Sequence, residues 1–288
     1  MTGLVRTRAE LAAQLAAERT SKPVVLVPTM GALHQGHRSL LDVARAVPDA
    51  HVVTSIFVNP LQFGPEEDLD RYPRTLDSDL AMCAAAGVDL VFAPSAAQMY
   101  PSGKPAVTVD PGPMGQLLEG ESRPGFFGGV LTVVLKLFSL IRPDVAVFGE
   151  KDAQQLAMVR RMVADLDLGV AIVPVPTVRD LDGLAISSRN SYLSAADRAA
   201  ALALPCALRA GVQVAQAGGA AAQVLAAAQA TLDNSAQLTV DYLALVDPAT
   251  FKPGTAGQAV LAVAATAGST RLIDNVHIEL RGSVAASH

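Results

Sequence analysis

Five short and almost entirely apolar segments occur between residues 24 and 175, and segments of helical character separate them. The five segments are 24–27, 52–58, 90–93, 145–148 and 170–175. The strands of a parallel sheet are buried on both faces and therefore read as continuous apolar runs. Residues 76–86, 126–141 and 153–166 predict helices between them. The alternation predicts an α/β fold with a doubly wound parallel sheet, in which ligands bind beyond the carboxyl ends of the strands.

The character of the chain changes after about residue 178. Residues 195–230 are rich in alanine and predict two helices that are separated near Gly218 and Gly219. Three strand-like segments follow, at 240–246, 259–264 and 270–280. We therefore expect a Rossmann-like domain over residues 1–177 and a smaller α+β lid domain, with an antiparallel sheet, over residues 178–288.

Composition and charge exclude several classes of function. Hydrophobic residues make up 51 % of the chain and charged residues 17 %, which indicates a compact globular protein. The net charge of −5 argues against a nucleic-acid partner, because phosphate backbones attract clustered lysine and arginine. The most apolar stretch, 126–141, carries Lys136 and is too short to span a bilayer, so no membrane partner is expected. Cys83 and Cys206 lie far apart, which disfavours a disulfide framework or a metal cluster and favours a reducing cytoplasm.

Residues 24–37 carry the clearest chemical signature. An apolar run that Pro28 ends is followed by a glycine-bearing loop and a predicted helix over residues 38–47, with His34 and His37 at the helix entrance. A helix entrance offers unpaired backbone N–H groups and a partial positive charge, which suit a phosphate. The same field disfavours an imidazolium, so we expect both rings to be neutral N–H donors that stabilise a phosphate as its charge grows in a transition state. A lone histidine here is more often a cap or surface residue, but two at this spacing favour nucleotide phosphate binding.

Three further polar segments follow predicted strands or the end of the first domain. Residues 149–152 include Lys151, whose compact charge could hold ATP phosphates and stabilise departing pyrophosphate. Residues 186–190 form a donor-rich loop around Arg189 that could close over a polyphosphate. Residues 59–64 carry neutral amides that could bind the hydroxyl and carboxylate groups of a small polar substrate. Each segment alone could be a surface or capped turn, but the position of 149–152 at a strand end favours a shared site with the first loop.

Together these segments resemble the pantothenate synthetase (pantoate–β-alanine ligase) family of the His-x-Gly-His nucleotidyltransferase superfamily. The matching motifs, in chain order, are 28–37, 57–63, 70–75, 118–120, 123–124, 149–152 and 187–190. The resemblance implies ATP-driven condensation of (R)-pantoate with β-alanine through an enzyme-bound pantoyl adenylate, with release of AMP and pyrophosphate. It also implies a cytoplasmic homodimer that uses Mg²⁺ carried with ATP and has no metal site of its own.

The resemblance also implies a role for individual residues. Catalytic roles fall on His34, His37, Lys151 and Arg189, with His37 as the proton donor. The residues implied to bind ATP are Met30, Gly31, Ala32, Leu33, His34, Gln35, Gly36, His37, Gly149, Glu150, Lys151, Asp152, Val178, Ile186, Ser187, Ser188 and Arg189. The residues implied to bind the other substrates are Gln62 and Gln155 for pantoate, with Asn59 and Gln62 near the amine acceptor.

Some positions depart from the family's pattern. Gln35 replaces a glutamate, Phe126 replaces a polar residue and Ala153 replaces an aromatic one. Ser78 breaks an acidic pair, so no metal site is expected at Asp79. Two other functions stay open: a nucleotidyltransferase that leaves AMP on its product, and a catalytically idle nucleotide-binding subunit. AMP release that depends on an added amine would exclude the first, and a turnover assay would exclude the second.

Overall fold

The structure is a computed structural model that describes residues 2–18, 22–65 and 67–281. The chain divides into two compact units. Unit 1 comprises Met1–Glu150 and Met158–Pro176, and unit 2 comprises Lys151–Ala157 and Thr177–His288. One short segment after residue 150 therefore belongs with the C-terminal part of the chain.

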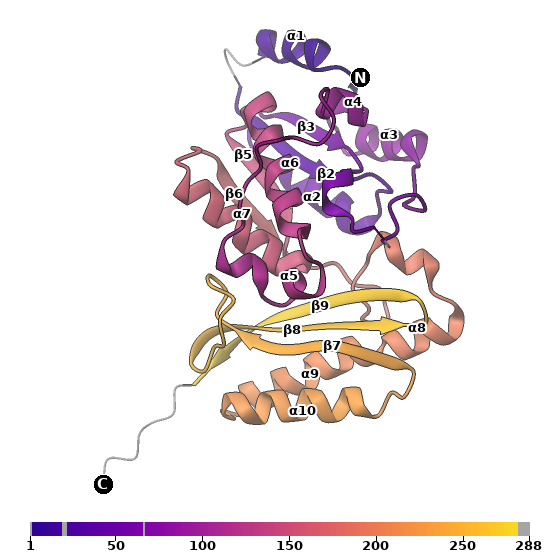
Figure 1. Ribbon diagram of the computed structural model, residues 1–288, viewed down its shortest axis with the longest axis vertical. Helices are drawn as coiled ribbons and strands as arrows, with labels where there is room; N and C mark the ends of the chain where they lie inside the picture. The colour runs from indigo at the N-terminus through magenta and orange to yellow at the C-terminus, as the bar shows by residue number, and fades with distance from the viewer. Residues whose placement is uncertain (1, 19–21, 66, 282–288) are drawn as a thin grey trace. The chain divides into compact units, whose positions relative to one another are not determined.

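Unit 1 contains a six-stranded sheet in the order β1-β4-β3-β2-β5-β6, and each strand runs parallel to its neighbours (Figure 1). The strands are β1 (Gly3–Val5), β2 (Val24–Thr29), β3 (His51–Ile56), β4 (Leu90–Phe92), β5 (Val145–Gly149) and β6 (Ala171–Val175). From β2 the chain adds strands on one side, and from β5 it adds them on the other. The order therefore reverses between β2 and β5, which is where sheets of this class bind ligands beyond the strand ends. This confirms the predicted Rossmann-like fold class.

The structure corrects two details of the predicted strands. Pro28 does not end β2, which continues to Thr29 in register with β3. Over the described residues β2 pairs with β5 at Val25 and Leu26 alone, so the later part of β2 borders one neighbour and tolerates a proline. The sequence did not predict β1, because its three residues are too few to show a period.

Helices cover both faces of this sheet. The helices before the end of β5 are α1 (Arg8–Glu18), α2 (Gln35–Arg45), α3 (Leu76–Ala85), α4 (Ala96–Met99), α5 (Glu119–Ser122) and α6 (Phe126–Ile141), with the short 3₁₀ turns η1 (Pro60–Gln62) and η2 (Pro113–Gln116). Leu40, Leu41 and Ala44 of α2 pack with Cys83 of α3 against apolar side chains of the strands. Helix α6 contacts β2 and α1, and it is buried on most of its surface, as predicted. Helix α1 was not predicted from the sequence.

The polypeptide passes between the units in η3 (Glu150–Asp152) and α7 (Ala153–Asp165), whose first residues count with unit 2. Of the helices in the described part of the chain, none is long and apolar enough to cross a membrane.

Unit 2 contains an antiparallel sheet of three strands in the order β7-β8-β9, packed on two long helices (Figure 1). Its elements are η4 (Ser188–Tyr192), α8 (Ala195–Ala201), α9 (Ala203–Gln216), α10 (Ala221–Asp233), β7 (Leu238–Val246), β8 (Gly257–Ala267) and β9 (Thr270–Leu280). The antiparallel sheet and the break at the glycine pair are confirmed. The prediction of two helices over residues 195–230 is wrong, because a further break occurs at Leu202. Pro205 explains it, since proline is tolerated in the first turn of a helix but not in its interior.

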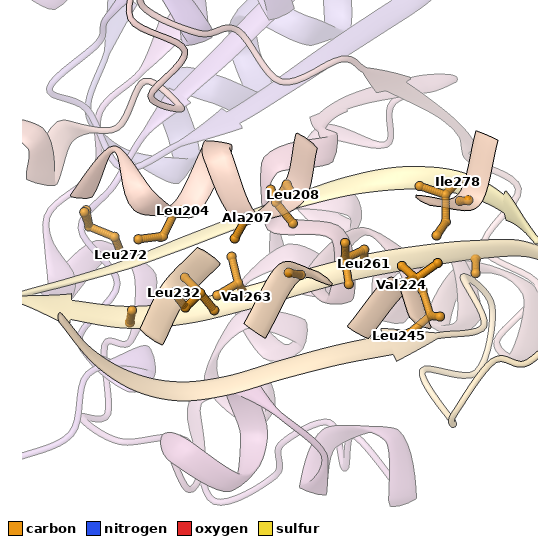
Figure 2. Close-up of a cluster of buried hydrophobic side chains, with 14 of the residues drawn as sticks. Leu204, Ala207, Leu208, Val224, Leu232, Leu245, Leu261, Val263, Leu272 and Ile278 are labelled. Atoms are coloured by element: carbon orange, nitrogen blue, oxygen red, sulfur yellow. The ribbon is translucent and has the colours of Figure 1, made fainter. Parts of the chain in front are cut away.

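The core of unit 2 shows why this region is rich in alanine. Leucine and valine side chains from β8 and β9 point at α9 and α10, with Leu261 and Val263 near the centre (Figure 2). Small residues such as Ala207 and Ala228 lie between them and are fully buried. At Gly211 a β-carbon would lie 2.4 Å from the end of the Leu261 side chain, so any other residue here would force Leu261 to move.

Candidate active site

The loop that follows β2 turns sharply at Gly31 and Ala32, whose φ angles are +84° and +50°. A β-carbon at Gly31 would lie 3.0 Å from both the Asp79 carboxylate and the Ile56 side chain, so any other residue would push both aside and be strained at this φ. Ala32 adopts a conformation that is strained for a residue with a β-carbon. Other groups must therefore hold the turn in place.

Asp79 of α3 holds the turn by hydrogen bonds to its backbone. Its Oδ2 accepts the N–H of Ala32 at 3.0 Å, and its Oδ1 accepts the N–H of Leu33 at 2.8 Å and the hydroxyl of Thr75 at 3.2 Å. The residue is 2 % exposed, and a buried carboxylate is stable only when such partners surround it. Asp79 thus acts as an acceptor that shapes the loop. Over the described residues, no group of three or more His, Cys, Asp and Glu side chains is placed to hold a metal ion.

The two histidines form the entrance of α2. The helix begins at Gln35 rather than at residue 38, because His34 is its N-cap and the second half of the motif forms its first turn. His34 Nδ1 accepts the N–H of Gly36 at 3.1 Å, and His37 Nδ1 accepts the N–H of His34 at 3.3 Å. The ring centroids are 4.1 Å apart. A ring nitrogen that accepts an N–H carries no proton, so in the neutral form each ring has its proton on Nε2 and can donate it to a ligand.

The amide side chains of Asn59 and Gln62 also lie together, as their shared segment predicted. Asn59 is 1 % exposed and caps η1 by accepting the N–H of Leu61 at 3.3 Å. Its Nδ2 donates to Gln62 Oε1 at 3.0 Å. Gln62 Nε2 in turn donates to Met30 Sδ at 3.1 Å, which joins this segment to the loop after β2. Gln62 is therefore held between the two predicted binding segments of unit 1.

Arg123 explains how Phe126 is accommodated in place of a polar residue. The guanidinium donates to both Glu67 carboxylate oxygens, at 2.8 and 2.5 Å, and to the Gln62 carbonyl at 3.1 Å. Its centre lies 3.7 Å from the centroid of the Phe126 ring. Arginine stacks favourably on an aromatic face, so Phe126 supports the arginine that holds the Gln62 backbone.

Unit 2 brings together several residues predicted to bind ATP. The N–H of Ile186 donates to the Val178 carbonyl at 3.0 Å, which places these two residues side by side. The Ser187 hydroxyl accepts the N–H of Arg189 at 3.3 Å and caps η4. A donor-rich turn is thereby joined to the Val178 backbone within a short span of chain.

Lys151 is also held in unit 2. Its carbonyl accepts the side-chain N–H of Asn275 at 2.9 Å, and its Nζ lies 4.0 Å from Asp152 Oδ1. The neighbouring Asp274 is 3 % exposed and accepts two hydrogen bonds from Arg179, at 2.6 and 2.9 Å. These contacts fix the backbone at Lys151 and leave its flexible side chain partly exposed. Gln155 lies in the first turn of α7 and is partly buried.

The roles of Tyr100, Asn275 and Asp79 were not predicted from the sequence. One signal was available for Asp79, which shares a helix face with buried Cys83 and Ala86 at spacings of four and seven residues. A carboxylate on an apolar helix face must have a buried partner. Tyr100 and Asn275 gave no such signal, because each acts across a contact between distant parts of the chain.

Comparison with known proteins decides the family. The sequence model described as "Pantoate-beta-alanine ligase" matches residues 3–277. The chain belongs to the pantoate–β-alanine ligase family. The predicted resemblance and the predicted enzyme class are therefore both confirmed.

Relatives of this ligase share most of its length. A pantothenate synthetase of Thermobifida fusca (strain YX) is 64 % identical over 89 % of this chain and 90 % of its own. One of Salinispora arenicola (strain CNS-205) is 59 % identical over 97 % and 99 %. The crystal structure of pantothenate synthetase from Thermus thermophilus superposes with a TM-score of 0.90 at 50 % identity, covering 95 % of this chain and 98 % of that one. The Francisella tularensis pantoate-beta-alanine ligase, complexed with beta-gamma ATP and beta-alanine, gives a TM-score of 0.80 at 31 % identity, covering 96 % and 97 %.

Proposed function

We propose that this ligase condenses (R)-pantoate with β-alanine in two steps, with ATP as the source of energy. In the first step a pantoate carboxylate oxygen attacks the α-phosphorus of ATP, and pyrophosphate leaves. In the second step the amine of β-alanine attacks the acyl carbon of the pantoyl adenylate, loses a proton and displaces AMP. The observation that carries the proposal is the pair of Nε2 donors at the entrance of α2, in a chain of this family.

The two histidines, the lysine and the arginine have different roles at the ATP phosphates. His34 and His37 donate from Nε2 to phosphate oxygens, and these bonds strengthen as negative charge accumulates in the transition state. His37 donates a hydrogen bond from Nε2 to the departing pyrophosphate and keeps its proton. Lys151 and Arg189 neutralise the charge on the pyrophosphate as it leaves.

The rest of the ATP site follows the sequence motifs. We assign the nucleotide to residues 30–37, 149–152, Val178 and 186–189. Mg²⁺ is carried on the ATP phosphates, where it supplies charge neutralisation. Asp79 does not suit it as a ligand, because both carboxylate oxygens already accept hydrogen bonds from the protein.

The other substrates are assigned to amide side chains. Gln62 and Gln155 bind pantoate, and Asn59 and Gln62 lie next to the amine acceptor. We assign pantoate binding and the other nucleotide contacts to residues 1–177. We assign the role of a lid to residues 178–288, which contribute Val178 and 186–189 to the nucleotide and exclude water from the acyl adenylate.

Assembly and compartment complete the proposal. We propose a homodimer in the cytoplasm, a reducing compartment that suits two free cysteines, Cys83 and Cys206. The small-molecule partners are ATP, pantoate and β-alanine.

A single-turnover experiment tests the two-step reaction. ATP and pantoate without an amine should give a burst of pyrophosphate that is stoichiometric with enzyme, with little AMP released. Addition of β-alanine should then release AMP and restore turnover. Pyrophosphate release that requires β-alanine would refute the two-step order. Continuous AMP transfer to a stable product without an amine would instead support the nucleotidyltransferase alternative.

A further inference from the structure

A buried chain of hydrogen bonds determines which way the Gln62 amide points. Its fixed points are two backbone groups that cannot exchange roles, because a carbonyl can only accept and an N–H can only donate. Asn59 Nδ2 lies 3.1 Å from the Gly129 carbonyl, and Asn59 Oδ1 lies 3.3 Å from the N–H of Leu61. The reversed Asn59 amide would place oxygen against oxygen and N–H against N–H. Its orientation therefore follows from the backbone.

The direction of Gln62 follows from that of Asn59. The second proton on Asn59 Nδ2 is directed at Gln62, at 3.0 Å, so the Gln62 atom at this position must be the oxygen. The Gln62 NH₂ group then lies on the other side, 3.1 Å from Met30 Sδ. A thioether sulfur is a weak acceptor, so a substrate oxygen offers this group a stronger hydrogen bond than Met30 does.

Tyr100 completes the chain from a distant part of the sequence. It follows α4, is 7 % exposed, and donates its hydroxyl to Asn59 Oδ1 at 2.8 Å. Burial raises the pKa of Tyr100 to about 12, so the hydroxyl keeps its proton at neutral pH. Asn59 Oδ1 thus accepts from both Tyr100 and Leu61, which opposes rotation of the amide.

The close packing of α6 against η1 holds the Asn59 side-chain amide in position. A β-carbon at Gly129 would lie 2.2 Å from the Leu61 carbonyl, so the helix approaches η1 more closely than any other residue would permit. This approach brings the Gly129 carbonyl within reach of the Asn59 side chain. Each polar atom of the Asn59 amide therefore faces one backbone group with a fixed role, the Gly129 carbonyl or the Leu61 N–H, and each also bonds one side chain, Gln62 or Tyr100.

We propose that Tyr100 and Asn59 are positioning residues that fix the Gln62 amide with its NH₂ group, and not its oxygen, toward the substrate. Gln62 then recognises a hydrogen-bond acceptor, which for pantoate is a carboxylate oxygen. This inference rests on the proposed function, since it takes Gln62 to be a pantoate-binding residue. It adds the direction of the hydrogen bond and assigns a role to Tyr100.

Two substitutions of Gln62 test the direction of the amide. Gln62→Ala removes the donor and should raise the KM for pantoate about tenfold, the effect of losing one hydrogen bond to a charged group. Gln62→Glu replaces the donor with a negatively charged acceptor that repels the pantoate carboxylate, so its KM for pantoate should exceed that of Gln62→Ala. A glutamate variant that binds pantoate as well as or better than the alanine variant would show that the oxygen faces the substrate, and would overturn the proposal.

Tyr100→Phe tests the positioning role while it keeps the ring. We expect the KM for pantoate to rise about three- to tenfold and the KM for ATP to change by less than about twofold, because one hydrogen bond that orients the donor is lost. In the Gln62→Ala background the same substitution should have no further effect on the KM for pantoate, since the group that it orients is absent. Equal effects in both backgrounds, or no effect in either, would refute the positioning role.

Thr132→Val is the control, because it removes a different hydroxyl of unit 1, a partly buried one that accepts the N–H of Val109 at 3.0 Å. It should leave both KM values unchanged, and melting temperatures would show that every variant is folded. The proposed function has a separate readout. A wild-type enzyme that forms no pyrophosphate from ATP and pantoate would refute that function, whereas an active wild type with an unaffected Tyr100→Phe variant would refute the positioning role alone.

Discussion

The substitution Asp79→Asn should disturb the loop after β2, which we propose binds the nucleotide, without changing the size of the side chain. The carboxylate accepts the N–H of Ala32 with one oxygen and the N–H of Leu33 with the other. An asparagine has one oxygen, so in either orientation its NH₂ group faces one of these two N–H groups. A donor then opposes a donor in a buried site.

The magnitude follows from the burial of the site. A buried N–H that loses its acceptor costs about 1–3 kcal/mol, and Ala32 is held in a conformation that itself costs about 1–3 kcal/mol. When one of the two hydrogen bonds from the Asp79 carboxylate is lost, the turn can relax out of that conformation. We expect the free energy of unfolding to fall by about 1–3 kcal/mol, and the melting temperature by about 2–12 °C for a protein of this size. If the competent loop is tenfold less populated, the Kd for ATP rises about tenfold.

Asp77→Asn is the matched control, because it makes the same change of charge on an exposed position of the same helix, α3. Thermal unfolding and calorimetric titration with ATP would be measured for both variants. We expect the control to match the wild type in both measurements. If Asp79→Asn also matched the control, with the same melting temperature and the same Kd for ATP, the carboxylate would not hold the loop and the argument would fail.

Three other predictions follow from the site and its surroundings. His37→Ala should slow single-turnover formation of the adenylate by about two to four orders of magnitude with its melting temperature retained; a rate within about threefold of wild type would exclude His37 from the mechanism. Lys151→Ala should slow the same step, and Lys151→Arg should restore the rate only in part, because a planar guanidinium replaces a compact charge. An alanine variant with an unimpaired rate would show that the turn at residues 149–152 has a structural role alone. Burial, and then the charge of Asp79, raises the pKa of Cys83 from 9.0 to about 11. The folded state therefore binds this proton more tightly than the unfolded state does, and the resulting stability is fully present below pH 9.0 and is lost as the pH rises toward about 11. Cys83→Ser should flatten this part of the stability profile, and rapid alkylation of Cys83 in the native state would contradict its burial.

The sheet was predictable because burial on both faces leaves a strong pattern. The segments at 90–93 and 145–148 needed no knowledge of their neighbours, since a strand covered on both sides must be apolar at every position. The end of β2 was not predictable in the same way. Whether Pro28 can remain in the strand depends on which neighbour extends beside it, and that is a property of the assembled sheet.

The alanine-rich region, residues 195–230, shows that helix boundaries can be hard to predict even where helix itself is evident. Alanine favours a helix at every position and marks no boundary, so residues 195–230 indicated helix without showing where one ends. The break at the glycine pair was visible because glycine readily adopts a positive φ, and Gly218 has a φ of +85°. The break at Leu202 is marked only by Pro205, a few residues farther on.

The polar residues of the candidate site also differ in how far the sequence could predict them. His34, His37 and Lys151 stand in motifs, so the sequence identified them as candidates. Asn59 was identified as a polar residue after a strand, but two of its four hydrogen bonds are with Tyr100 and Gly129, which lie 41 and 70 residues away along the chain. No local pattern encodes such partners.

The histidine motif finally shows that capping and phosphate binding are not competing explanations. A cap requires an acceptor directed at the backbone, and a phosphate requires a donor directed outward. An imidazole offers both on opposite sides of one ring, and the N–H groups of Gly36 and His34 occupy the Nδ1 side in each case. The cap thereby selects the form of the ring that donates from Nε2. A serine or aspartate would satisfy the same backbone groups, but neither would offer a ring N–H. The helix end and the phosphate binding that we propose would therefore both favour histidine at the two positions.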